Sequence, residues 1–200
     1  MKALLALGLE LAWMILVSPS GLTLRLQKLP GRLAGIVIFV LLSLVSLSFA
    51  TALYHLRSHY TRAFVVLIPL MAVICFFFLV LSGFVFTAVL DQWIRWKKPD
   101  KAVHLISALQ IVLLAWIPGI FVLPAAVTAA IFSFKMILFW VLFGFIAFWS
   151  FNSLAEAMRY HYEMDKKSIR LACLITTAIL VGLAALFFLF GFFELATVVV

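Results

Sequence analysis

The chain has 200 residues, of which 68% are hydrophobic and only 11% charged, and its formal net charge is +8. This balance excludes a soluble globular domain, which is roughly half apolar and roughly a quarter charged. A positive charge of this size in so apolar a chain suits contact with anionic lipid head groups better than a nucleic-acid partner.

The first 32 residues are predicted to form a cytoplasmic N-terminal segment that lies in the membrane interface. Lys2 precedes an apolar run over residues 3–17, which is interrupted by Glu10 and ends before Pro19. The run is shorter than the roughly 20 apolar residues that a membrane span needs. We therefore expect an interfacial amphipathic helix with Trp13 near the head groups and with residues 1–17 retained. A cleaved signal peptide is the alternative, because a basic residue before an apolar run resembles one.

Five long stretches without Lys, Arg, Asp or Glu follow, and each is long enough to cross a bilayer as a helix. The predicted spans cover about residues 33–56, 63–90, 103–127, 136–156 and 171–193. No repeat or low-complexity linker divides them, so residues 33–200 are predicted to form one membrane domain. The expected fold is an all-α integral membrane protein, a bundle of five transmembrane helices.

The third stretch is the least regular, because it contains Pro118, Gly119 and Pro124. Proline removes backbone hydrogen bonds and kinks or ends a helix. We expect a helix over about residues 103–122 and then a tight turn over residues 124–135. Pro69 is expected to bend the second helix. Kinks that help the bundle to pack are favoured here over a gating hinge.

The basic residues predict the orientation of the bundle. The segments outside the five charge-free stretches hold four, two, four, one, four and no Lys or Arg in chain order. Basic loops stay on the cytoplasmic side, which places the N-terminal segment and the loops at residues 91–101 and 156–170 inside. The N-terminus is then cytoplasmic and the C-terminus outside, as five spans require. All four tyrosines flank spans and are expected at the interface: Tyr54, Tyr60, Tyr160 and Tyr162.

Motifs of covalent chemistry are absent from the sequence, which contains no Walker motif, HExxH or GxSxG and no pair of carboxylates within a span. His55 and His59 would share one helix face, but no acid or cysteine nearby offers a third metal ligand. We therefore expect a non-enzymatic protein without cofactor or metal. Small residues at helical spacing, such as Ser43 and Ser46, could permit a homo-oligomer.

The basic residues of the two later inner loops are the candidate site for a partner or a lipid head group, because their positive potentials add near an anionic surface. The expected partners are membrane lipids, including anionic ones. Orienting the chain during insertion is the alternative role. The residues are Arg95, Lys97, Lys98, Lys101, Arg159, Lys166, Lys167 and Arg170.

The order of these features resembles the Yip family of multispanning membrane proteins, named for interaction with Ypt/Rab GTPases. Residues 11–19, Leu-Ala-Trp-Met-Ile-Leu-Val-Ser-Pro, and the amphipathic residues 22–29 look like the segment before the first span of prokaryotic members. Residues 102–118, which end in Trp-Ile-Pro, are similar to the third span, and residues 151–167 to the polar helix before the last span. The resemblance implies the five-span topology with the N-terminus inside.

The predicted function is therefore that of a non-enzymatic, Yip-type protein of the bacterial inner (plasma) membrane, which acts as a membrane organiser or partner-binding scaffold. The alternative is a small transporter, channel or lipid-translocating protein that uses a neutral intramembrane cavity. A lipid-filled or water-filled groove between helices favours this alternative, and a tightly packed bundle favours the scaffold.

Overall fold

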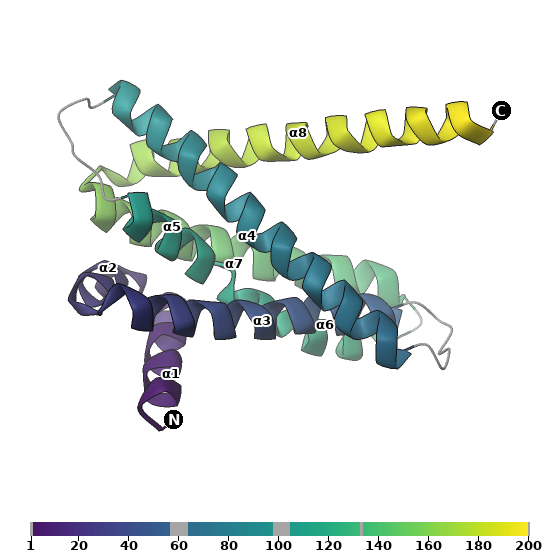
Figure 1. Ribbon diagram of the computed structural model, residues 1–200, viewed down its shortest axis with the longest axis horizontal. Coiled ribbons are helices and arrows are strands. Elements are labelled where there is room, and N and C mark those ends of the chain that lie inside the picture. The colour runs from purple at the N-terminus through teal and green to yellow at the C-terminus, as the bar shows by residue number, and fades with distance from the viewer. Residues whose placement is uncertain (1, 57–63, 98–104, 133, 200) are drawn as a thin grey trace.

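The computed structural model describes the backbone of residues 2–56, 64–97, 105–132 and 134–199, and the side chains of residues 4–56, 66–97, 105–132 and 134–182. These residues are helical throughout, apart from short turns (Figure 1). The elements in chain order are α1 (Lys2–Val17), α2 (Pro19–Lys28), α3 (Gly31–Leu56), α4 (Phe64–Lys97), α5 (Leu105–Leu114), the 3-10 helix η1 (Ile117–Phe121), α6 (Val122–Ala130), α7 (Lys135–Tyr162) and α8 (Lys166–Val199).

Among the described residues, four segments are long and apolar enough to cross a membrane: Gly31–Leu56, Val66–Lys97, Leu105–Ala130 and Lys135–Tyr162. They match four of the five predicted spans and indicate a multi-span helical membrane protein. The fifth predicted span, residues 171–193, lies within α8, whose side chains are described only as far as Gly182. That span therefore stays a prediction.

The third span is interrupted at its middle, but not where the sequence suggested. The helix breaks after Leu114 and passes through η1, which holds Pro118, and α6 then continues through Pro124 to Ala130. The prediction of a turn beginning near Pro124 was wrong. Pro124 is the third residue of α6, and in the first turn of a helix the missing N–H needs no intrahelical partner.

Ser48 of α3 stabilises this interruption from a neighbouring helix. Its hydroxyl donates to the carbonyl of Ile120 at 2.9 Å and accepts from the N–H of Leu123 at 3.0 Å. Irregular backbone within a membrane is tolerated where neighbouring side chains satisfy its polar groups. Gly119 allows the approach, since a Cβ there would lie 2.8 Å from Phe49 Cε2 and 3.0 Å from Val45 Cγ1.

Helices fill most of the two loops that were predicted to be cytoplasmic. α4 continues to Lys97, and only residues 163–165 separate α7 from α8. Glu163 ends α7 in the left-handed conformation (φ 47°), and its N–H donates to the carbonyl of Arg159. Tyr160 and Tyr162 both lie in the last turn of α7, at the predicted end of the fourth span, but only Tyr160 is exposed, whereas the side chain of Tyr162 is fully buried in the bundle. The short turn folds α8 back over the end of α7 and so covers Tyr162.

Helices α1 and α2 run crosswise to α3 and lie near the end of the molecule where α7 meets α8 (Figure 1). Leu11 and Ile15 of α1 and Leu22 of α2 are fully buried in the largest hydrophobic core, together with residues of α3, α4, α5, α7 and α8. A smaller cluster around Ala126 and Phe139 lies toward the other end of the spans. The crosswise helices are therefore part of the packed bundle.

Candidate functional site: the basic end of the bundle

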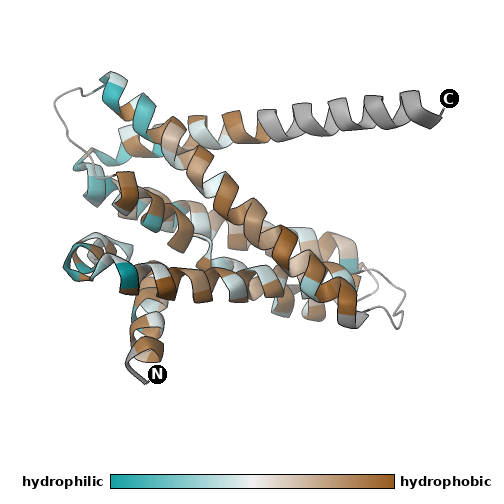
Figure 2. Cartoon of the chain, in the orientation of Figure 1, coloured by the Kyte–Doolittle hydropathy of each residue, from teal (hydrophilic) through white to brown (hydrophobic). Residues whose placement is uncertain are grey.

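Polar residues gather at one end of the molecule (Figure 2), where α4 and α7 end and where α3, α5 and α8 begin. We call this the basic end. Lys98 and Lys101 of the predicted site lie outside the described residues. The described basic residues there are Arg25, Lys28, Arg32, Arg95, Lys97, Arg159, Lys166, Lys167 and Arg170. The three predicted cytoplasmic segments thus meet at the same end, and their binding role stays a prediction.

Arg95 is held by a buried carboxylate one helical turn earlier. Its Nε donates to Oδ2 of Asp91 at 2.7 Å, and the side chain of Asp91 is only 8% exposed while that of Arg95 is 53% exposed. The phenol of Tyr162 lies close enough to Asp91 to interact with it. A buried charge requires such partners. Arg95 therefore neutralises Asp91 and turns only part of its side chain to the surface.

Lys97 and Arg159 lie against aromatic rings. Lys97 Nζ is 5.9 Å from the ring centre of Trp93 and 5.4 Å from that of Trp96. Arg159 lies 5.4 Å over Tyr160, and its Nη1 donates to Glu156 Oε1 at 3.0 Å. Tryptophan and tyrosine prefer the level of the head groups. These contacts suit side chains that lie at a membrane interface.

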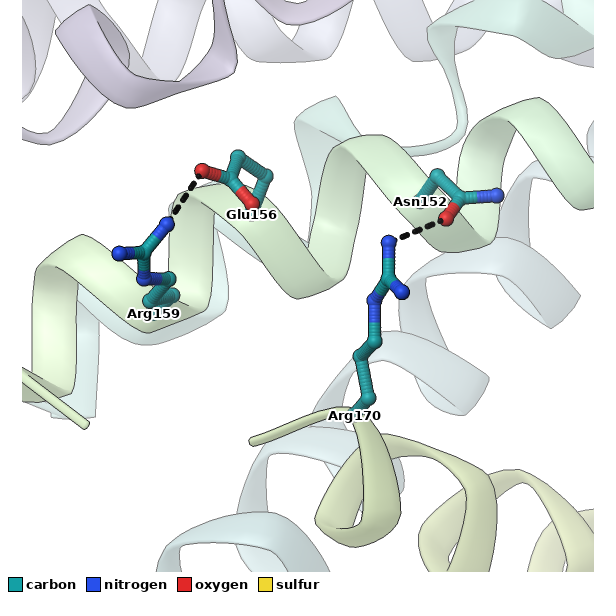
Figure 3. A network of polar contacts seen from close by, with 4 residues as sticks. All are labelled: Asn152, Glu156, Arg159 and Arg170. Carbon is teal, nitrogen blue, oxygen red and sulfur yellow. Dashed lines mark hydrogen bonds and ion pairs between the residues drawn. The ribbon is translucent and has the colours of Figure 1, made fainter. Parts of the chain in front are cut away.

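Lys166, Lys167 and Arg170 belong to the first two turns of α8 and are exposed. Arg170 reaches back to α7, where its Nη2 donates to Asn152 Oδ1 at 3.2 Å (Figure 3). Asn152 is the one asparagine of the sequence and was not among the predicted site residues. No sequence signal links it to Arg170, because their contact depends on the turn between α7 and α8.

Asp165 lies directly before α8 and caps the N-terminal end of that helix. The backbone N–H of Ser168 donates to Asp165 Oδ2 at 2.9 Å. Hydrogen bonds from Ser168, first from its side chain and then from its backbone, hold the pKa of Asp165 below its usual value. The carboxylate therefore stabilises the start of α8 in its charged form.

Side-chain bonds join the crosswise helices to each other and to α7. Arg25 of α2 pairs with Glu10 of α1 at 2.8 Å. Thr23 Oγ1 donates to the carbonyl of Ala157 at 3.3 Å, and Trp149 Nε1 donates to the carbonyl of Leu16 at 3.1 Å. The i,i+15 pair of Glu10 and Arg25 was not predicted, since it requires the turn at Ser18.

Two grooves lie on the described part of the chain, one on α4 and one beside α7. One, of about 610 Å³, lies on the last turns of α4 and is lined by Ala88, Val89, Gln92, Trp93 and Trp96. The other, of about 670 Å³, lies between α6 and α7. His59 lies outside the described residues, and no group of three or more His, Cys, Asp or Glu within the described part of the chain could hold a metal ion.

Comparison of the chain with models of known protein families, with curated proteins and with solved structures finds no match. The geometry of the basic end is therefore the basis for the functional interpretation.

Proposed function

We propose that this protein is a non-enzymatic membrane organiser, a multi-span bundle that holds two further helices in the plane of one leaflet. The observation that carries the proposal is the direction of α1, which runs crosswise to α3 near the basic end (Figure 1). A helix that lies in the interface buries its apolar face about 5–10 Å into one leaflet, and its binding depends on curvature and lipid composition. The spanning helices would anchor α1 at that depth permanently.

The outer side of α1 supports this placement. Leu5, Leu9 and Trp13 recur every fourth residue along one side of the helix and are 61%, 72% and 65% exposed. We call these three residues the α1 ridge. The opposite side buries Leu11 and Ile15 against the bundle. Large apolar side chains in a row are unfavourable in water, so the ridge suits the acyl chains of the leaflet on the basic side.

Kinship with the Yip family is part of this proposal, as is a bacterial inner membrane as the location. The kinship rests on the order of the crosswise N-terminal helices, the third span interrupted at Pro118 and the polar end of α7 before the last helix. The open groove between α6 and α7 favours a second candidate, a protein that moves lipids along its surface.

The experiment compares vesicles that contain the full chain with vesicles that contain a ridge variant, Leu5→Ala, Leu9→Ala and Trp13→Ala together. The protein is inserted into preformed liposomes, and its orientation is determined with a cysteine introduced at Lys97. We expect the mean vesicle diameter, measured by electron cryomicroscopy, to fall as the number of wild-type protein molecules per membrane area rises. The ridge variant should lose most of this effect, because it inserts less volume into one leaflet.

The matched control removes exposed apolar side chains from a spanning helix. Ile74→Ala, Phe77→Ala and Leu81→Ala alter α4 residues that are exposed to a similar degree. This variant should lower the mean vesicle diameter as much as the wild-type protein does. A ridge variant that retains the full effect, or a wild-type protein without one, contradicts the proposal. Transfer of a fluorescent lipid between leaflets by both variants, without a change of diameter, would establish the second candidate instead.

A further inference from the structure

The groove between α6 and α7 has a mostly apolar lining, with the polar side chains of Thr128 on α6 and of Asn152 at the last position of its α7 wall. Its volume is about 670 Å³, and it is open to the outside of the bundle. Phe121 and Trp149 form a stacked pair in its wall, with ring centres 5.7 Å apart. Phe121 belongs to η1, the α6 wall holds Pro124 and Thr128, and the α7 wall extends from Leu142 to Asn152. The outer surface of a spanning helix is bathed in lipid, so this groove faces acyl chains.

Asn152 connects the groove to a positive charge (Figure 3). Its Nδ2 donates to the carbonyl of Phe148 at 2.8 Å, which fixes the amide, and its Oδ1 accepts from Arg170 at 3.2 Å. Among the described residues, Arg170 is bonded to this neutral amide and to no carboxylate, whereas Arg159 is paired with Glu156. The guanidinium of Arg170 therefore offers an uncompensated charge beside the end of the groove.

The length of the groove matches one leaflet. Leu142 and Asn152 are ten positions apart on α7, which corresponds to about 15 Å along a helix. The hydrocarbon core of a bilayer is about 30 Å thick, so one leaflet provides acyl chains over about 15 Å. An acyl chain that begins beside Asn152 would thus end near Leu142.

We propose that this groove binds one anionic glycerophospholipid of the leaflet on the basic side. One acyl chain lies between α6 and α7 against Phe121 and Trp149, and the phosphate accepts hydrogen bonds from Arg170. Arginine suits this role, because its planar fork donates two parallel bonds to a phosphate. Asn152 is a positioning residue that directs the guanidinium, and Lys166 and Lys167 add to the positive potential. The inference requires that the chain span a membrane, but it does not depend on the role of α1.

The test measures lipid binding to the delipidated full chain in detergent by native mass spectrometry. The probes are phosphatidylglycerol and phosphatidylcholine with identical acyl chains. We expect the wild type to prefer phosphatidylglycerol, and Arg170→Gln to weaken its binding about tenfold, as loss of a charge-assisted hydrogen bond implies. Lys167→Gln removes the same charge from the same turn of α8 and should weaken binding less than about twofold, since a surface charge acts only through the potential.

A second pair of variants tests the groove itself. Thr128→Phe fills it and should weaken the binding of both lipids, whereas Val127→Phe, on α6 but outside the lining, should not. Equal effects of Arg170→Gln and Lys167→Gln would overturn the site in favour of diffuse charge. Equal binding of both lipids by the wild type would mean that the groove binds lipid without regard to the charge of the head group. A dimer that Thr128→Phe dissociates would identify a second copy as the occupant. Each of these results contradicts the proposal.

Discussion

Gly119 lies where η1 passes closest to α3. A Cβ at this position would lie 2.8 Å from the ring of Phe49 and 3.0 Å from a methyl group of Val45. Val45 is fully buried and stiff about χ1, so the contact cannot relax cheaply. We expect Gly119→Ala to lower the free energy of unfolding by about 1–3 kcal/mol. Thermal unfolding in detergent, followed by circular dichroism, measures the change.

Gly144 provides the control for this substitution. It lies inside α7, and no atom of another element lies within 4 Å of a Cβ built on it. Gly144→Ala should therefore stabilise the protein slightly, by about 0.5–1 kcal/mol, since alanine favours helix. Equal melting temperatures for the two variants would show that η1 and α3 are not in close contact.

Ser48 is the residue on which the interrupted third span depends most directly. Ser48→Ala leaves the carbonyl of Ile120 and the N–H of Leu123 without this hydroxyl. The expected cost is about 1–2 kcal/mol, as for other hydrogen bonds between helices in membranes. Ser43→Ala is the comparison, because Ser43 donates only to Phe39 of its own helix. Chemical unfolding of the two variants should separate them, and a Ser43 variant that is equally destabilised would argue against the bridge.

At the scale of elements, the start of α8 should depend on pH through Asp165. Its pKa is lowered in the folded state by the hydrogen bonds from Ser168. The stabilisation is therefore present above the unfolded pKa of about 3.9 and is lost as the pH falls through the lower folded value. Asp165→Ala should have a lower melting temperature than the wild type at pH 7, and the difference should shrink toward pH 3. A difference that stays constant with pH would mean that the carboxylate does not cap α8.

Helix α1 should contribute to the stability of the bundle as well as to its surface. Leu11 and Ile15 are fully buried in the main core, and Trp149 donates to the carbonyl of Leu16. Deleting residues 2–17 opens a cavity, and Leu-to-Ala changes in cores alone cost about 2–5 kcal/mol. We expect the truncated protein to have a markedly lower melting temperature than the full chain. The intact mass of each preparation confirms which residues it retains. If the truncated protein had an unchanged melting temperature, α1 would not contribute to the stability of the bundle.

At the scale of the whole molecule, the basic end is predicted to face the cytoplasm. The prediction follows from the 4, 2, 4, 1, 4, 0 distribution of Lys and Arg over the segments between the charge-free stretches. In a background with Cys75 and Cys173 replaced by alanine, a cysteine introduced at Val200 should react with an impermeant maleimide in intact cells. A cysteine at Lys97 should react only after permeabilisation. The reverse pattern would invert the orientation.

Sequence alone was sufficient for the helical membrane class, for four spans and for the gathering of basic residues at one end. Charged side chains are costly within lipid, so the stretches that lack them reveal the spans without any knowledge of packing. An irregularity in the third span was predictable from its prolines, but its position was not, because the helix breaks after Leu114, inside the helix expected over residues 103–122, and then continues through Pro124. Helix ends were less accurate: α4 and α7 continue for a further turn or two beyond residues 90 and 156.

Only the tertiary structure decided which side chains meet. Tyr162 is buried because α8 folds back over it, Asn152 meets Arg170 across the turn between α7 and α8, and the groove requires α6 beside α7. The crosswise course of α1 likewise depends on contacts with α3, α5 and α7. These contacts join residues far apart in the chain, and periodicity and charge report only on neighbours within one helix. The sequence determined which segments are long and apolar enough to cross a membrane, and packing determined which of their surfaces are buried and which are exposed.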